Sequence, residues 1–383
     1  MEFNFATAGK IIFGRGTVSQ VGTLAASMGC RALVVMVDER QAAPVLHSLR
    51  EAAVEVVGFC VTSEPTTASV REGTDRAREA GCELVVAAGG GSVIDTGKAV
   101  AALLTNGGDP LDYLEVVGRG QPLTKRSAPL IAIPTTAGTG AEVTANAVLA
   151  SPEHKVKVSL RGALILPHVA LVDPELTYSV PPAITASTGL DALTQVLEPY
   201  VSVAANPITD TLCREGLWRA AESLFKAFKD GDDAEAREDM ALVSLLGGLA
   251  LANAKLGAVH GFAGVLGGMY DAPHGAICGR LLPYVMEANV AALAAREPTN
   301  PALGRYSEVA TILTGDFEAT AADGVAWVRD LCQELAVPGL ATYGVRRGHF
   351  DDIVVKTQRS SSMKGNPLKL TDSELGAILG KAL

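Results

Sequence analysis

Two histidines and an aspartate stand out in this sequence as side chains that could bind a metal together. His260 and His274 are two of only six histidines, and the residues between them include several glycines and Pro273. A helix that ends near Gly267, followed by a loop, would bring both imidazoles to one point. Asp191 lies earlier in the chain, on an amphipathic segment. Two imidazoles and one carboxylate form a ligand set for a transition metal.

The segment that carries Asp191 has the periodicity of a helix with one polar side. Asp191, Gln195 and Glu198 follow the i, i+4, i+7 spacing and therefore share a face of the predicted helix. The leucines of the segment fall on a neighbouring face that would pack inward. An aspartate on such a helix is more often a cap or a surface group, so the spacing alone leaves its role open.

A second candidate site follows a short apolar run at residues 84–88. The run continues into Gly89, Gly90, Gly91 and Ser92, and then into a helical pattern. Successive glycines let the backbone approach a phosphate closely, and the start of a helix offers N–H groups without partners. The pattern predicts a pyrophosphate site, although it is not the GxGxxG fingerprint. A glycine-rich turn without function is the alternative.

Another strand-to-helix junction, at residues 134–140, is rich in threonine and glycine. Two such junctions at one edge of a parallel sheet favour a dinucleotide over a lone phosphate. Asp38, just after the apolar run at 31–37, could accept hydrogen bonds from a ribose diol and repel a 2′-phosphate. This favours NAD over NADP. Acidic residues commonly follow strands, so Asp38 by itself leaves the choice open.

The elements that must position these residues change in character along the chain. Strands alternating with helices predict an α/β domain with a parallel sheet covered on both faces. From residue 184 onward the periodicity is almost wholly helical. We therefore predict an α/β dinucleotide-binding domain at 1–180 and an all-α metal and substrate domain at 181–383. The expected strands lie at 31–37, 54–61, 84–88, 130–133 and 169–172, with helices at 42–53 and 70–80 between them.

The composition is that of a globular enzyme, with 48% hydrophobic residues. The net charge of −10 argues against nucleic acid or an anionic membrane as a partner, since both need basic patches. The six cysteines form no CxxC pair, which favours reduced thiols in a cytoplasmic protein. The longest apolar stretch, 240–252, is well short of the ~20 residues that span a bilayer. The first residues lack the pattern of a signal peptide.

Taken together, the motifs resemble the iron-containing (group III) alcohol dehydrogenase family, with its dehydroquinate synthase-like fold, over essentially the whole chain. The matching stretches are 10–16, 89–95, 134–144, 173–176 and 362–367. The resemblance implies an N-terminal dinucleotide domain, a C-terminal helical domain and a metal in the cleft between them. By motif match, the residues at metal-ligand positions are Asp191, His260 and His274. Those at cofactor-contacting positions are Asp38, Gly90, Gly91, Ser92, Thr135, Thr136, Thr139, Lys157 and Leu176.

Two positions depart from the pattern of the resembled family. Gln195 stands where the family usually carries a histidine four residues after the aspartate, and Gly264 replaces a further histidine. Gln195 can still offer a neutral amide oxygen, so it remains a candidate fourth ligand. Asp191, His260 and His274 form a two-histidine, one-carboxylate set that suits Fe(II), the expected ion, or Zn(II). Gly264 puts the usual proton path to solvent in question.

The resemblance implies an NAD-dependent oxidoreductase that transfers a hydride between NAD(H) and an alcohol, or its aldehyde or ketone, while a divalent metal polarises the substrate oxygen. Three alternatives stay open. They are a metal-independent enzyme like maleylacetate reductase, a lyase or cyclase of the dehydroquinate synthase type, and an NAD-binding relative that no longer catalyses. The sequence does not indicate which alcohol or carbonyl compound is the substrate. A homodimer or larger homo-oligomer is what the resemblance implies.

Overall fold

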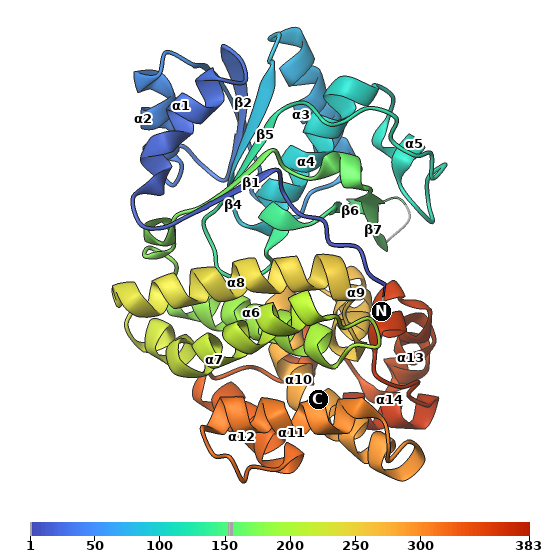
Figure 1. The fold of residues 1–383 in the computed structure, drawn as a ribbon. Helices are drawn as coiled ribbons and strands as arrows, with labels where there is room; N and C mark the ends of the chain where they lie inside the picture. Colours follow the sequence, from blue (N-terminus) through green and yellow to red (C-terminus); the bar gives the residue numbers. More distant parts are fainter. Residues whose placement is uncertain (1, 152, 154–155) are drawn as a thin grey trace. The chain divides into compact units, whose positions relative to one another are not determined.

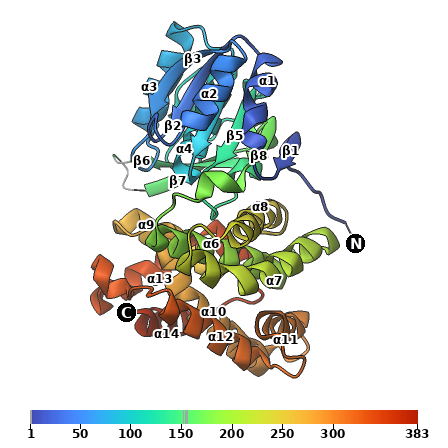
Figure 2. The ribbon, with the colours of Figure 1, turned by 90° about the vertical axis from the view of Figure 1, so that its left-hand side faces the viewer.

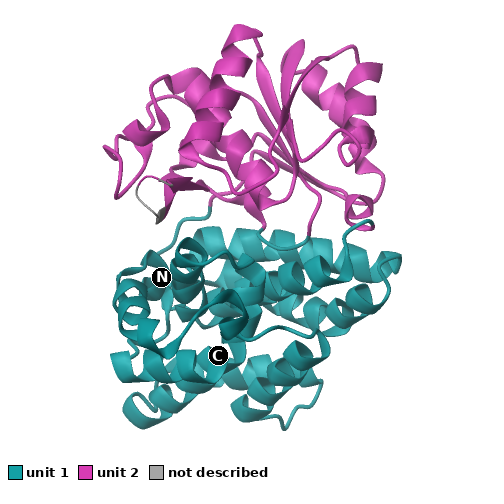
Figure 3. Ribbon diagram, turned by 180° about the vertical axis from the view of Figure 1, so that it is seen from behind, with its two compact units in different colours: residues 1–5, 137–139, 179–383 teal, residues 6–136, 140–178 magenta. Residues whose placement is uncertain are grey.

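The computed structural model describes residues 2–151, 153 and 156–383, which form two compact units. Unit 2 comprises residues 6–136 and 140–178, and unit 1 comprises residues 1–5, 137–139 and 179–383 (Figure 3). Each unit has its own hydrophobic core. It stays a prediction that the domain before residue 180 binds the cofactor and the domain after it binds the metal.

Unit 2 is built around a six-stranded sheet in which every pair of neighbouring strands is parallel (Figure 1). The strand order is β1-β8-β5-β4-β2-β3. The chain passes outward from β2 to β3 and then returns to place β4 on the other side of β2. The strand order therefore reverses between β2 and β4. The strands are β1 (Lys10–Phe13), β2 (Arg31–Met36), β3 (Glu55–Cys60), β4 (Leu84–Gly89), β5 (Leu130–Pro134) and β8 (Val169–Val172).

The side chains of the sheet enter two hydrophobic cores, one on each face. In β2, Leu33 and Val35 belong to one core, and Ala32 and Val34 belong to the other. Helices α3 and α4 cover the first face, and α1 and α2 cover the second (Figure 2). Strands buried on both faces are continuously apolar, which made β2, β4, β5 and β8 recognisable in the sequence. The edge strand β3 was also predicted, although it is largely half-buried. The helices of unit 2 are α1 (Val21–Ala26), α2 (Ala43–Glu51), α3 (Thr67–Glu79), α4 (Gly91–Asn106) and the short α5 (Pro110–Tyr113).

A separate antiparallel pair, β6 (Asn146–Ser151) and β7 (Val156–Arg161), packs against α4 and was not predicted. The buried Lys98 of α4 ties the two elements together. Its Nζ donates to the carbonyl of Asn146 at 2.7 Å and to the hydroxyl of Thr144 at 2.9 Å. A buried ammonium held by such acceptors fixes the position of β6 on the helix.

Unit 1 is helical from residue 182 onward, as predicted. Its central element is α6 (Pro182–Val201), which contacts α7, α8, α10 and α11. Every residue of α6 from 189 to 201 is buried, so its polar side chains lie inside the unit. The other helices are α7 (Pro207–Lys229), α8 (Ala234–Ala254), α9 (Ala258–Met269), α10 (His274–Arg296), α11 (Pro301–Thr314), α12 (Ala321–Glu334), α13 (Phe350–Arg359) and α14 (Asp372–Ala382).

These two units confirm the predicted fold class, a parallel-sheet α/β unit and an all-α unit. Within the described part of the chain, no single helix is both long and apolar enough to cross a membrane. Helices α8 and α9 pass that test only as a pair, and a bend of 100° separates them.

One carboxyl group of unit 2 is buried without a hydrogen-bonding partner for one of its oxygens. Glu142 lies in a single 3-10 turn (Ala141–Val143) and is 1% exposed, and its Oε1 makes no hydrogen bond to any described residue. Burial raises the pKa of the Glu142 carboxyl to about 7, against the opposing effects of a backbone hydrogen bond and the Lys98 charge. The folded protein therefore keeps Glu142 protonated at pH values where the unfolded chain has already ionised it.

This difference makes stability depend on pH, and Glu142→Gln tests it. Because the folded-state pKa is raised, the stabilising effect of the protonated carboxyl is fully present below about pH 4.5 and is lost as the pH rises through 7. Relative to the wild type, the variant should gain up to about 3 kcal/mol of unfolding free energy between about pH 5 and 8. The measurement is thermal unfolding as a function of pH. Glu79→Gln, at an exposed position, should show no such trend, and a flat difference for Glu142→Gln would contradict the interpretation.

Candidate metal centre

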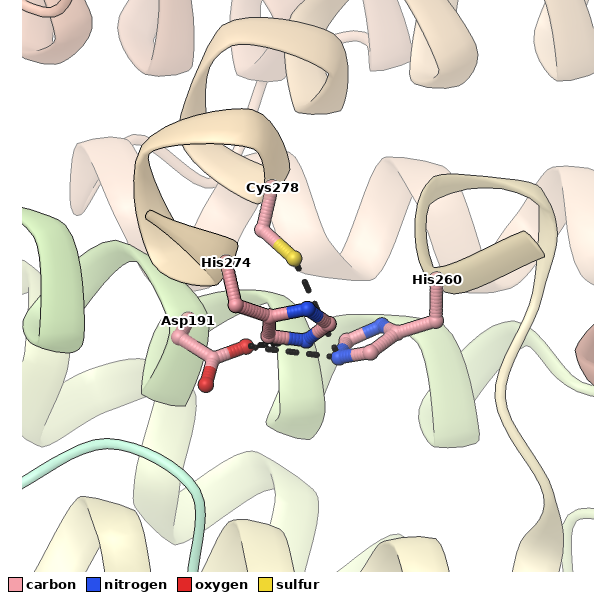
Figure 4. Close-up of side chains that lie close together, drawn as sticks. All are labelled: Asp191, His260, His274 and Cys278. Carbon is pink, nitrogen blue, oxygen red and sulfur yellow. Dashed lines mark hydrogen bonds and ion pairs between the residues drawn. The ribbon is translucent and has the colours of Figure 1, made fainter. Parts of the chain in front are cut away.

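Four side chains from three helices of unit 1 converge on one point in the interior. Asp191 comes from α6, His260 from the first turn of α9, and His274 and Cys278 from the start of α10 (Figure 4). Their ligand atoms all lie within 4.8 Å of one another. Asp191 Oδ1 is 3.3 Å from His260 Nε2 and 3.7 Å from His274 Nε2. The prediction that Asp191 and the two histidines lie together agrees with this geometry.

The buried carboxylate of Glu198 fixes the orientation of His260. Glu198 Oε2 lies 2.7 Å from His260 Nδ1, which leaves Nε2 of the ring directed toward Asp191. Its other oxygen, Oε1, accepts the backbone N–H of Val259 at 2.7 Å. Glu198 therefore caps the start of α9 and holds the imidazole in one orientation. A carboxylate or carbonyl that accepts the second ring N–H of a histidine is the usual partner of a metal-ligating imidazole.

The start of α9 also depends on a glycine and an asparagine. A side chain at Gly257 would place Cβ 2.8 Å from Glu198 Oε1 and 3.0 Å from Asn366 Oδ1, so only glycine admits both polar groups. Asn366 Oδ1 accepts the backbone N–H of Ala258 at 3.1 Å. The first N–H groups of a helix lack partners within the helix, and here the two side chains supply acceptors for them. His260 is held by this capped turn.

His274 and Cys278 are positioned by a close approach between α10 and α6. A Cβ at Gly275 would lie 2.0 Å from the carbonyl oxygen of Ser187, and a Cβ at Gly279 would lie 2.5 Å from the side chain of Leu190. The two glycines thus let the helices touch. Residues four apart share a helix face, so His274 and Cys278 both point toward Asp191. His274 is the exposed member, with 40% of its side chain accessible, whereas the side chain of Asp191 is 4% accessible.

The electrostatics of the centre favour positive charge. Burial alone would lower the pKa values of His260 and His274, but Cys278 and Asp191 beside them outweigh it. The pKa of His260 is raised well above its usual value, and that of His274 is raised to about 9. Although Asp191 is buried, the two histidines lower the pKa of its carboxyl. Asp191 Oδ1 makes no hydrogen bond to a described residue, so this buried anionic oxygen suits a cation bound between the imidazoles.

Gln195, the predicted fourth ligand, lies one turn after Asp191 and is 2% exposed. Its Nε2 donates to the carbonyl of Gly138 at 3.0 Å, and its Oε1 has no hydrogen-bond partner among the described residues. Gly264 lies on an exposed face of α9, and a Cβ there would meet open space. The amide of Gln195 is therefore fixed through its nitrogen, and position 264 offers no group that could carry a proton.

Most of the predicted cofactor residues follow the carboxyl ends of adjacent strands in unit 2. The ends of β4 and β5 lie side by side, because Thr135 donates its backbone N–H to the carbonyl of Gly89 at 3.1 Å. The loops that follow are also close, since a Cβ at Gly90 would lie 3.3 Å from Thr136 Oγ1. Gln41, from the loop after β2, donates to Thr135 Oγ1 at 3.2 Å. The predicted residues at this edge are Asp38 after β2, Gly90, Gly91 and Ser92 after β4, Thr135 and Thr136 after β5, and Leu176 after β8.

Two predicted cofactor residues lie elsewhere. Thr139 belongs to the short segment 137–139 of unit 1. Lys157 lies on β7, with its Nζ 3.3 Å from Glu64 Oε2. Their roles toward a cofactor stay predictions.

Sequence reasoning missed Cys278 and did not give Glu198 its role. The signal for Cys278 was its spacing, four residues after His274 on the same predicted helix. Glu198 was placed on the polar face of its helix with Asp191, but its contact with His260 depends on how α6 and α9 pack. The role of Glu198 therefore becomes visible only when the helices are assembled.

Residues 8–174 match the family model described as iron-containing alcohol dehydrogenase, and residues 185–383 match that of the C-terminal domain of the Fe-containing alcohol dehydrogenase family. The chain is 34% identical to 1,3-propanediol dehydrogenase of Klebsiella pneumoniae over 394 residues, which covers 99% of this chain and 98% of the relative.

Two solved structures have the same fold over the whole chain. A 1,3-propanediol oxidoreductase has a TM-score of 0.93 at 34% identity, with full coverage of both chains. The sulfoacetaldehyde reductase of Bifidobacterium kashiwanohense, solved in complex with NAD+, has a TM-score of 0.88 at 30% identity, covering 100% of this chain and 99% of the other. The resemblance seen in the motifs, and with it the predicted oxidoreductase class, is confirmed: the chain belongs to the iron-containing alcohol dehydrogenase family.

Proposed function

We propose that this protein transfers a hydride between NAD(H) and a small alcohol or its carbonyl counterpart, with a divalent metal held by Asp191, His260 and His274. The observation that carries the proposal is the convergence of the two imidazole Nε2 atoms on one buried carboxylate oxygen, Asp191 Oδ1. The family to which the chain belongs is described as iron-containing alcohol dehydrogenases, which supports an alcohol as the substrate. Fe(II) is the expected ion and Zn(II) the alternative, because both accept two imidazoles and a carboxylate.

Each residue of the centre has a separate role that fits metal-assisted hydride transfer. A bound divalent cation would supply a Lewis acid for the substrate oxygen. The side chains of Asp191 and His260 are buried, whereas that of His274 is partly exposed, so solvent reaches the centre from the side of His274. Glu198 keeps the Nε2 lone pair of His260 directed at the centre. Gln195 completes the predicted ligand set with an unused amide oxygen.

The edge of the sheet in unit 2 supports NAD as the second reactant, which would accept or donate the hydride. In open α/β sheets, ligands bind beyond the carboxyl ends of the strands where the strand order reverses. That reversal lies between β2 and β4, where Asp38 and the glycines before α4 are found. Helix α4 starts at Gly91 with no side-chain cap, so its first N–H groups are available to a pyrophosphate. The NAD+ complex of the related sulfoacetaldehyde reductase agrees with this assignment.

Location and assembly are proposed more broadly. The six cysteines are free thiols, which supports a reducing compartment such as the cytoplasm. A homodimer or larger homo-oligomer is carried over from the family resemblance, and light scattering of the purified protein measures it. The relatives act on 1,3-propanediol and sulfoacetaldehyde by their names, which supports a small polar alcohol or aldehyde as the substrate class.

The first experiment replaces the carboxylate of the centre. Asp191→Ala should reduce metal content and turnover to background, because the anionic ligand is removed, while NAD binding measured by nucleotide fluorescence should be unchanged. The exposed Asp330→Asn is the matched control and should retain metal. Full alcohol or aldehyde turnover by metal-free protein would contradict the proposal and favour a metal-independent reductase.

A second experiment tests the orienting carboxylate. Glu198→Gln keeps the shape of the side chain but weakens its hold on the second ring N–H of His260, so metal affinity should fall by about 10–100-fold. The measurement is competition for Zn(II) with a chromogenic chelator. Glu334→Gln, at an exposed position of α12, should leave the affinity as in the wild type. Unchanged affinity in Glu198→Gln would show that Glu198 serves the fold alone.

A third experiment addresses the choice between NAD and NADP. Asp38 is exposed at the end of β2 and accepts the backbone N–H of Gln41 at 2.8 Å. Replacing it with serine removes a negative charge that would repel a 2′-phosphate. The ratio of kcat/KM for NADP to kcat/KM for NAD should therefore rise by about tenfold or more, which corresponds to about 1.4 kcal/mol of repulsion removed. Glu39→Gln, one residue further and also exposed, is the control. An unchanged ratio in Asp38→Ser would remove Asp38 from the cofactor site.

A further inference from the structure

We infer that the thiolate of Cys278 is a ligand of the same metal, which gives the centre an Asp191–His260–His274–Cys278 donor set. The inference rests on the proposed function only in that a divalent cation binds at this centre. It adds a ligand that the motifs did not indicate, and it changes the expected metal preference.

The distances fit a four-ligand site. In tetrahedral zinc sites the bonds are about 2.0–2.2 Å to nitrogen and oxygen and about 2.3 Å to sulfur, so neighbouring ligand atoms lie about 3.3–3.7 Å apart. Asp191 Oδ1 lies 3.3 Å from His260 Nε2 and 3.7 Å from His274 Nε2. Cys278 Sγ lies 4.0 Å from His260 Nε2. Since all four atoms lie within 4.8 Å of one another, small side-chain rotations suffice to close them around one ion.

The surroundings of Cys278 favour a ligand over a packing residue. Its sulfur is fully buried and lies against polar atoms of Asp191, His260 and His274. Cys332, which is also buried, donates instead to the carbonyl of Gly279 at 3.2 Å. Asp191 Oδ1, buried and without a hydrogen bond to any described residue, points at the same space. Cys278 thus borders the apolar core on one side and this polar cluster on the other.

The packing of α10 against α6 holds Cys278 close to Asp191. His274 and Cys278 are four residues apart on α10, and Gly275 and Gly279 allow the same helix to touch Ser187 and Leu190 of α6. The first turns of α10 are thereby held against the helix that carries Asp191. Any ion placed between Asp191 and the two imidazoles therefore has the Cys278 sulfur within reach.

Cys278 is also a stronger donor than Gln195. The amide of Gln195 is neutral and already anchored by its Nε2 to Gly138. A cysteine thiolate is anionic and polarisable, and thiolate ligands favour Zn(II) over harder ions. We expect Cys278 to shift the preference of this centre toward Zn(II). Zinc also accepts five ligands, so four protein donors leave room for a small molecule.

Cobalt(II) spectroscopy of the purified protein tests the inference directly. The metal is removed, Co(II) is added in equimolar amount, and the near-ultraviolet spectrum is recorded for the wild type, Cys278→Ser and Cys213→Ser. A sulfur-to-cobalt charge-transfer band should appear in the wild type and in Cys213→Ser, whose thiol is buried in α7, and should be absent in Cys278→Ser. Gln195→Ala should retain the band.

Zinc affinity provides the second readout. Cys278→Ser should bind Zn(II) at least about tenfold more weakly than the wild type, as expected from the effect of removing even an outer partner of a ligand. Cys278→Ala serves as a second variant if the serine protein does not fold, and thermal unfolding of each metal-free protein shows whether folding is retained. Co(II) binding to the wild type without the charge-transfer band, or with a band that survives in Cys278→Ser, overturns the inference and leaves the proposed function standing. Failure of the wild type to bind any divalent metal overturns both.

Discussion

The buried carboxylate of Glu198 is the interaction on which the centre depends. A charged group in the interior is costly unless hydrogen bonds and an opposite charge surround it. Glu198 meets this requirement through the N–H of Val259 and the ring of His260. The same contacts cap α9 and orient the imidazole, so the start of the helix and the orientation of the His260 ring depend on the same carboxylate.

The second constraint is the packing of helices around α6. Because this helix is buried from residue 189 to 201, its polar side chains face the helices that enclose it. Asp191 finds the two histidines, and Glu198 finds the start of α9. The glycines of α10 remove the side chains that would hold the helices apart. The helical unit thus encloses the buried acidic side chains of Asp191 and Glu198 on α6.

Features that depend on neighbouring residues in the chain could be predicted from the sequence, whereas features that depend on contacts between distant segments could not. The central strands were recognisable because burial on both faces makes them continuously apolar, and His260 and His274 because their residue type and loop spacing are local signals. The edge strand β1 has no buried residue, and β6 buries only alternate residues, so neither forms the continuous buried run that marks the central strands. Strand β1 and the pair β6–β7 were therefore not predicted. The role of Glu198 and the place of Cys278 depend on contacts between helices distant in sequence. The predicted ligands were identified from their residue types, whereas the contacts of Glu198 and Cys278 with them depend on how the helices pack.

The central claim is that one divalent metal binds between Asp191, His260 and His274. The most direct test is a crystal structure of the zinc- or iron-loaded protein, with anomalous diffraction recorded on both sides of the metal absorption edge. A single anomalous peak is expected in the helical unit, about 2.0–2.2 Å from Asp191 Oδ1 and from the Nε2 atoms of both histidines. A metal-loaded crystal with no peak there, or with its peak away from these three side chains, would contradict the account.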